Sequence, residues 1–202
     1  MEVTTTEAKI KAAAQKVFLE KGFSGARMQD IADKAGINKA LLHYYYRSKD
    51  KLFDIIFMES FQKIIPKINL IAQSDAPLFE KIEKFVGEYI VAINADPMVP
   101  LFVLHELTRH PEKFIQKVFS ATDGGPKVGK LVAQIQEEAE KGNIRPIHPA
   151  TLLMNIMSLC IFPYIGKPMF QMVLSIDDKQ FSTLLAQRKT EVSAFVINAL
   201  RL

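Results

Sequence analysis

Residues 39–47 carry side chains that can read DNA bases, and their spacing places them on one side of a short helix. At 100° per residue, one side of this helix holds Lys39, Ala40, His43, Tyr44 and Arg47. The ammonium group of Lys39 can donate to guanine O6 or N7, the methyl of Ala40 can contact a thymine methyl, and His43 can reach the next base edge. The pattern indicates direct readout in a major groove.

The opposite side of the same helix is suited to packing. It holds Leu41, Leu42, Tyr45 and Tyr46. We expect Tyr46 to belong to a core cluster, whereas Tyr44, Tyr45 and Lys49 can bond to phosphates, which fixes register without reading sequence. His43 has no second ligand at suitable spacing on its own face, so a metal site is not predicted there.

A second group of chemically interesting residues runs from His105 to His110. Zinc hydrolases use H-E-x-x-H, in which the two histidines lie four residues apart on one helix face. Here His105 and His110 are five apart, about 140° around a helix, and cannot hold one ion without distortion. The chain also has no glycine-rich phosphate loop and no nucleophile elbow. We therefore predict neither an enzyme nor a bound cofactor or metal.

Apolar residues at helical spacing, interrupted by Gly, Pro and Asn, predict the elements that position these side chains. Gly22 should end the first helix, Asn38 should cap the third, and Pro66 should bend or stop the fourth. No stretch alternates with a period of two, so the fold class is all-α. The predicted helices cover residues 6–21, 28–34, 39–46, about 48–66, 78–95, 98–109, 111–121, 126–141, 149–165 and 178–201.

Composition and charge support a globular protein with a polyanionic partner. Of its 202 residues, 49% are apolar and 24% charged, and the formal net charge is +4. All of this excess lies in residues 1–53, which points to a partner such as DNA at the N-terminal end. Cys160, the single cysteine, excludes an intrachain disulfide and is expected in the core. The longest apolar stretch, 151–166, is shorter than a membrane span, and we expect a cytoplasmic protein.

The segment 36–52, GINKALLHYYYRSKDKL, resembles the signature of the TetR family, usually written G-V-S-x-G-x-L-Y-x-Y-F-x-S-K-E-x-L. Upstream, Phe18, Gly22-Phe23, Asp30-Ile31-Ala32 and Ala35-Gly36 also match the first two helices of that family. The resemblance covers residues 6 to about 60. Ala40, His43 and Ala26 stand where the family often has Gly, Tyr and Thr, so its base preferences do not transfer to this chain.

The resemblance implies a helix-turn-helix DNA-binding domain at 1–50, linked by the helix from about 48 to 66, and a helical effector-binding and dimerisation domain at 51–202. It also implies Lys49 as a phosphate anchor, with Arg27 taking over a contact often made by the missing Thr. The predicted DNA-binding residues are Arg27, Met28, Gln29, Asn38, Lys39, Ala40, His43, Tyr44, Tyr45 and Lys49.

In the C-terminal part the resemblance supplies only architecture, in which the last two long helices pair with those of a second subunit. Their apolar stripes are compatible with this, although burial within one chain is the alternative. The expected dimer contacts are Leu152, Ile156, Leu159, Phe181, Leu184, Leu185, Val192, Phe195 and Val196. A methionine-rich apolar set with a few polar groups is typical of a small-molecule pocket. The expected effector contacts are Phe102, His105, Phe114, Met154, Met157, Phe162, Tyr164 and Phe170.

These observations together predict a homodimeric regulator that binds a palindromic DNA operator and is released from it by an apolar or amphipathic small molecule. In the family, ligand binding typically changes the separation of the two DNA-binding domains. Two alternatives stay open at this point. One is an activator of the same fold, and the other is a sequence-independent DNA-binding protein, which is expected to spread positive charge over more of its surface.

Overall fold

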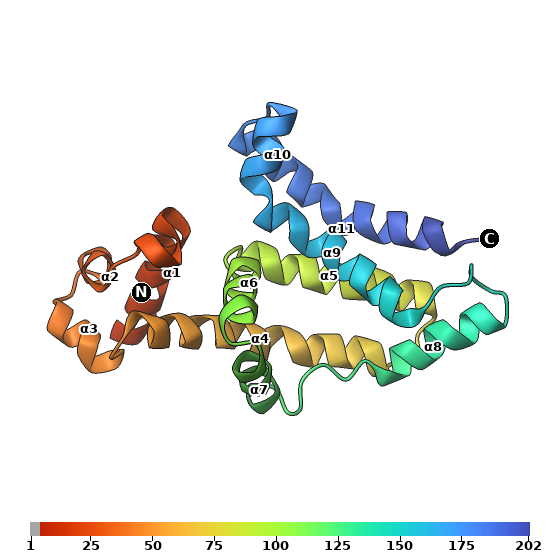
Figure 1. Ribbon diagram of the computed structural model, residues 1–202, viewed down its shortest axis with the longest axis horizontal. Helices are drawn as coiled ribbons and strands as arrows, with labels where there is room; N and C mark the ends of the chain where they lie inside the picture. The colour runs from red at the N-terminus through yellow and green to blue at the C-terminus, as the bar shows by residue number, and fades with distance from the viewer. Residues whose placement is uncertain (1–4) are drawn as a thin grey trace. The chain divides into compact units, whose positions relative to one another are not determined.

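The computed structural model describes residues 5–202, and this part of the chain contains helices and no strands (Figure 1). The all-α prediction is therefore confirmed. The helices divide into two compact units, of which the first ends at Ser60 and the second runs from Phe61 to Leu202. Helix α4 contributes to both units.

The N-terminal unit consists of three helices and the start of a fourth. They are α1 (Thr6–Gly25), α2 (Met28–Ala35), α3 (Lys39–Tyr45) and α4 (Lys49–Gln73). Gly22 interrupts α1 with φ 66° and ψ 172°, a conformation that is essentially restricted to glycine. The regular helix thus breaks where the sequence predicts, and one further turn continues to Gly25.

Aromatic packing holds the N-terminal unit together. The Phe53 ring lies 4.8 Å from that of Phe18 and 4.5 Å from those of Phe23 and Phe57, measured between centroids. Phe18, Phe53 and Phe57 are almost completely buried. Because these rings come from α1 and α4, they join both ends of the unit around one core.

The C-terminal unit contains the rest of α4 and seven further helices within the described residues. These are α5 (Leu78–Ala95), α6 (Val99–Arg109), α7 (Pro111–Ala121), α8 (Gly129–Glu140), α9 (Pro149–Ile165), α10 (Lys167–Leu174) and α11 (Asp178–Leu200). All but α10 begin and end within about three residues of the predicted positions. Helix α10 was not predicted, because residues 167–174 have only eight residues and lack the spacing of a longer amphipathic helix.

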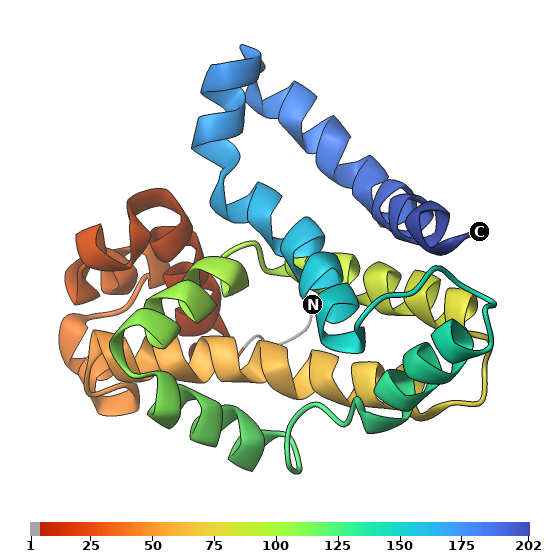
Figure 2. The ribbon, with the colours of Figure 1, turned by 45° about the vertical axis from the view of Figure 1, so that its right-hand side comes forward.

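Helix α9 is central to the C-terminal unit, since it contacts α5, α6, α8, α10 and α11 (Figure 2). Its buried side chains join the main core, and Cys160 is completely inaccessible, as expected. Burial raises the pKa of the Cys160 thiol to about 12. In the part of the chain that the structure describes, no single helix is long and apolar enough to cross a membrane; two bent pairs, α5–α6 and α9–α10, reach that length and composition only together.

Pro66 does not stop α4, which continues to Gln73, so of the two predicted outcomes, a bend or a stop near residue 66, the stop was wrong. Pro66 itself is exposed, whereas Ile64, Ile65 and Ile68 on either side of it are buried in the core. Burial of these side chains outweighs the single helical hydrogen bond that a proline removes. At the far end of α4, the buried ammonium of Lys81 donates to the carbonyl of Ala72 at 3.3 Å.

A second internal proline, Pro163 in α9, is compensated by a side chain from α11. Proline has no N–H, so the carbonyl of Leu159, four residues earlier, lacks its helical donor. Nη2 of Arg188 donates to this carbonyl at 2.6 Å. Within the described residues Arg188 has no carboxylate partner, and its buried Nε has no hydrogen-bond partner. Arg188 therefore links α9 and α11 at the point where α9 is weakest.

We expect Arg188→Met to lower the free energy of unfolding by about 1 to 3 kcal/mol, because it leaves the Leu159 carbonyl without a donor. In a Pro163→Ala background the restored backbone N–H serves that carbonyl, so the same substitution should cost clearly less. Urea unfolding of the four proteins at one fixed concentration measures this coupling. An equal cost of Arg188→Met in both backgrounds would contradict it.

Candidate functional site

The turn between α2 and α3 has the features of a helix-turn-helix. Gly36 ends α2 in the left-handed conformation, with φ 67°. Two residues later the Asn38 side-chain oxygen accepts from the backbone N–H of Leu41 at 2.7 Å, so Asn38 caps α3 as predicted. The direction of α3 is thus set by two residues whose conformational preferences are strong.

Helix α3 presents most of its side chains to solvent. Leu42 is fully buried, and Tyr46, directly after the helix, is 3% exposed. The five residues expected to face DNA are all exposed: Lys39, Ala40, His43, Tyr44 and Arg47. The prediction that Leu41 packs inward was wrong, since it is 36% exposed; Tyr45 is 41% exposed, and its predicted phosphate contact stays a prediction. A helix of seven residues at the surface needs only one narrow buried stripe, and Leu42 and Tyr46 provide it.

Tyr46 is a core residue, as predicted. Its hydroxyl donates to Glu7 Oε1 at 3.1 Å, and burial together with this bond raises the pKa of Tyr46 far above its ordinary value. Glu7 also pairs with Lys11, which in turn bonds to Glu59 on α4. The end of α3 is therefore fastened to α1, and α1 to α4, through polar groups.

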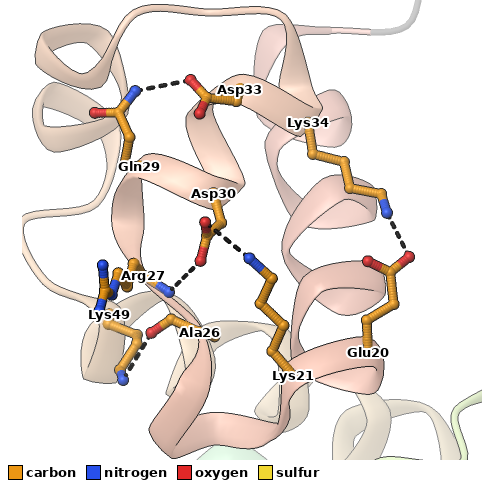
Figure 3. A network of polar contacts seen from close by, with 9 residues as sticks. All are labelled: Glu20, Lys21, Ala26, Arg27, Gln29, Asp30, Asp33, Lys34 and Lys49. Carbon is orange, nitrogen blue, oxygen red and sulfur yellow. Dashed lines mark hydrogen bonds and ion pairs between the residues drawn. The ribbon is translucent and has the colours of Figure 1, made fainter.

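Lys49, the expected phosphate anchor, is held by the protein itself. Its ammonium donates to the carbonyls of Phe23 at 2.7 Å and Ala26 at 3.0 Å, and it lies 4.4 Å from the centroid of the Phe23 ring. Figure 3 shows Lys49 beside Ala26 in the turn between α1 and α2. An ammonium has three donors, so at most one remains for a phosphate. Lys49 first of all fixes the start of α4 to this turn, and its DNA contact stays a prediction.

The residues around the start of α2 make several polar contacts, of which those of Asp30 join three residues (Figure 3). Asp30 Oδ2 accepts from the backbone N–H of Arg27 at 3.0 Å, and Asp30 also pairs with Lys21 at 2.9 Å. The Lys21 bond and, after it, the Arg27 bond lower the pKa of Asp30. Arg27 itself is exposed and available to a phosphate, whereas the Gln29 amide already donates to Asp33 at 2.7 Å. Met28 is half-buried.

The predicted effector contacts do not gather in one place. Phe102 and Phe114 are buried and pack on Phe61, with centroid distances of 6.4 and 5.7 Å to that ring. The remaining six residues divide among several surroundings. The Tyr164 hydroxyl donates to Asn94 at 2.7 Å; the rings of Phe162 and Phe170 lie 5.8 Å apart; Met154 is 61% exposed; His105 and Met157 are half-buried.

Open grooves of the C-terminal unit lie elsewhere. A groove of about 510 Å³ between α4, α5 and α11 is lined by Lys67, Leu70, Ile71, Glu83, Lys84, Gly87, Glu88 and Lys189. Another of about 450 Å³ follows α9 and α11, and its lining includes Asn155, Ser158, Leu159 and Phe195. A third lies beside Pro66, Asn69 and Thr122. None of these three contains a residue of the predicted effector set.

The predicted dimer contacts fall into two classes. Five of them are buried inside the single chain: Leu152, Ile156, Phe181, Val192 and Val196. Two of these, Leu152 and Val196, also line the groove along α9 and α11. Their burial favours the alternative that the wide apolar stripes of α9 and α11 pack within one chain, and their place in a subunit interface stays a prediction. Phe195 and Leu184 are 65% and 43% exposed, and Leu159 and Leu185 are half-buried. Two other exposed side chains of α9, Met154 and Phe162, were not predicted at this surface. Apolar spacing alone does not distinguish the outer face of a helix from its inner face.

The two histidines near residue 108 lie in different surroundings at the end of α6. His105 Nε2 lies 3.5 Å from Nη1 of Arg109, and His110 caps the junction of α6 and α7 with its backbone. Among residues 5–202 no group of three or more His, Cys, Asp or Glu side chains could hold a metal ion.

Helix, glycine-containing turn and exposed second helix define this chain as a helix-turn-helix DNA-binding protein. Residues 10–56 match the family model described as "Bacterial regulatory proteins, tetR family". The chain is 28% identical over 181 residues to the HTH-type transcriptional repressor NicS of Pseudomonas putida, a match that covers 87% of this chain and 84% of NicS.

Two further proteins extend the comparison. The biofilm operon icaADBC HTH-type negative transcriptional regulator IcaR of Staphylococcus aureus is 25% identical over 125 residues, covering 61% of this chain and 66% of IcaR. The transcriptional regulator FadR of Bacillus subtilis, solved in complex with stearoyl-CoA, matches in fold with a TM-score of 0.62 at 18% identity, covering 95% of this chain and 97% of FadR. The match at residues 10–56 therefore places a DNA-binding domain of the TetR family of bacterial regulatory proteins in the N-terminal part of this chain.

We expect Lys49→Met to destabilise the N-terminal unit by about 1 to 3 kcal/mol, because the carbonyls of Phe23 and Ala26 lose their donor. Urea unfolding followed by near-ultraviolet absorption of the tyrosines of α3 measures the loss. The matched control is Lys51→Met, an exposed lysine on the same helix, which should change stability by less than about 0.5 kcal/mol. If both variants unfold like the native protein, Lys49 has no structural role.

Proposed function

We propose that this chain is a ligand-responsive, sequence-specific transcriptional repressor that binds a palindromic operator as a homodimer in the cytoplasm. The observation that carries the proposal is the outer face of α3, where Lys39, Ala40, His43 and Tyr44 are exposed side by side on a helix fixed by Leu42 and Tyr46. Repression rather than activation is favoured because NicS and IcaR are both named as negative regulators.

A second subunit is proposed to cover the outer sides of α9 and α11. Four large apolar side chains there are between 43% and 65% exposed to solvent: Met154, Phe162, Leu184 and Phe195. Exposed apolar patches of this kind commonly mark interfaces. A palindromic site also requires two reading helices, which a two-fold dimer supplies.

The effector is proposed to be an amphipathic small molecule. The groove between α4, α5 and α11 supports this choice, because Leu70 and Ile71 give it an apolar wall while Lys84, Glu88 and Lys189 give it a charged rim. Its volume of about 510 Å³ lies in the usual range for small-molecule sites. The FadR structure, which contains stearoyl-CoA, is an example of a ligand complex of this fold.

DNA binding by α3 is tested by fluorescence anisotropy with the DNA flanking the gene, at about 150 mM salt and with excess unrelated competitor. Lys39→Ala combined with Tyr44→Ala should reduce selectivity by at least about 10-fold, since it removes a base contact and a phosphate contact. Lys63→Ala, which removes the same charge from the C-terminal unit, should not. Equal binding of specific and competitor DNA by the native protein would refute the proposal. Release of the complex by amphipathic but not by purely polar compounds tests the effector class.

The proposed interface predicts that Phe195→Glu with Leu184→Glu yields a monomer at micromolar concentration, because burying two carboxylates against a partner is strongly unfavourable. Sedimentation velocity measures the change. Leu70→Glu is the control, because Leu70 is an even more exposed leucine, at 77%, but lies on α4, and it should leave the dimer intact. A native protein that sediments as a monomer would rule out the interface.

A further inference from the structure

Within the described residues the imidazole of His43 makes one hydrogen bond, and that bond fixes the position of its proton. His43 is the last basic residue of α3 and is exposed on the DNA-facing side. Its Nδ1 lies 3.3 Å from the backbone carbonyl oxygen of Arg47. A carbonyl oxygen can only accept a hydrogen bond, so Nδ1 must carry the proton and donate it.

This bond determines what the other ring nitrogen can do. In a neutral imidazole one nitrogen is a donor and the other an acceptor. With the proton on Nδ1, Nε2 is an acceptor. Within the described residues no protein group bonds to Nε2. His43 therefore offers the outer side of α3 a single unused acceptor.

The major groove presents few groups that an acceptor can bind. Adenine offers the N6 amino group and cytosine the N4 amino group, whereas guanine and thymine offer the oxygens O6 and O4. An acceptor pairs with the two amino groups and is repelled by the two oxygens. Lys39, one turn earlier on the same face, has the opposite preference, because an ammonium group can only donate.

We propose that His43 is a specificity-determining residue that selects a base with a major-groove amino group, adenine or cytosine, next to the base contacted by Lys39. The inference rests on the proposed function, since it assumes that α3 reads DNA. It assigns to the two residues complementary roles: Lys39 selects a base that accepts and His43 a base that donates. The Arg47 carbonyl is the positioning group that holds the imidazole in the required tautomer.

The tautomer is tested first, without DNA. A long-range proton–nitrogen NMR spectrum of the native protein at about pH 8, assigned with His43→Gln, distinguishes the two neutral forms. We expect Nδ1 of His43 to be protonated and Nε2 to be free. A proton on Nε2 would overturn the inference, because that nitrogen would then be a donor.

The base preference is tested by selection from a randomised DNA library with the native protein, His43→Ala and Lys39→Ala. One position should lose its preference only in His43→Ala, and its preferred base should be adenine or cytosine on one strand. A guanine or thymine at that position, or no position that depends on His43, would overturn the inference while the proposed function stands. If the native protein selects no sequence, the proposed function fails and the inference with it.

A base analogue then tests the amino group itself. For adenine the analogue is 2-aminopurine, which moves the amino group to the minor groove; for cytosine it is pyrimidin-2-one, which lacks the 4-amino group. The native protein and Lys39→Ala should each lose about 10-fold in affinity for the modified site, and His43→Ala less than about twofold. Equal losses for all three proteins would overturn the assignment.

Discussion

Seven residues are too few to form a stable helix in water, so the reading face depends on contacts that α3 makes with the rest of its unit. Only Leu42 and Tyr46 are buried, and every other anchor is polar. Asn38 serves a free N–H at the start of α3, Tyr46 is bonded to α1 at its end, and Lys49 attaches the following helix to the turn before α2. Because these contacts hold α3 in place, its outer side contributes little to the stability of the unit.

In the C-terminal unit, too, backbone groups without a helical partner are satisfied by other means, and here the groups are carbonyls. Proline in a helix removes a donor, and the two internal prolines of this chain meet that loss differently. Pro66 is exposed, so this part of the helix faces solvent. The buried side chains on either side of Pro66 keep the helix intact by packing. Pro163 lies where α9 contacts α11, and a carbonyl without a hydrogen-bond donor is costly there. The guanidinium of Arg188 donates to that carbonyl. The charge on Arg188 is thus explained by a backbone requirement in a different helix.

Much of the fold was readable from the sequence because helix boundaries here coincide with Gly, Pro and capping residues. Asn38 and Gly36 could be placed because their conformational preferences are local. The outward side of α9 could not be predicted, since this helix is apolar all round and only packing shows which face is inside. Helix α10 lacked a sufficiently long pattern. The partner of Arg188 could not be predicted, because it is the backbone carbonyl of Leu159, which lies 29 residues earlier and lacks its helical donor.

In the DNA-reading unit, sequence and resemblance located the candidate side chains but not their bonds. His43 was placed on the correct face by angle alone, yet its proton is fixed by the Arg47 carbonyl, which no spacing rule identifies. Lys49 shows the reverse case, in which a residue expected at a phosphate is already held by carbonyls. Long side chains reach several partners, and only the fold decides between them.

The single cysteine of this chain is fully buried, and burial raises the pKa of its thiol to about 12, so the neutral thiol dominates at neutral pH. The thiolate is the form that peroxides and alkylating agents attack. Burial and the raised pKa together therefore make Cys160 unreactive in the folded protein. For the experimenter, a cysteine introduced on any exposed position will be the only reactive thiol, which makes site-selective attachment of a fluorophore possible without first removing the native residue.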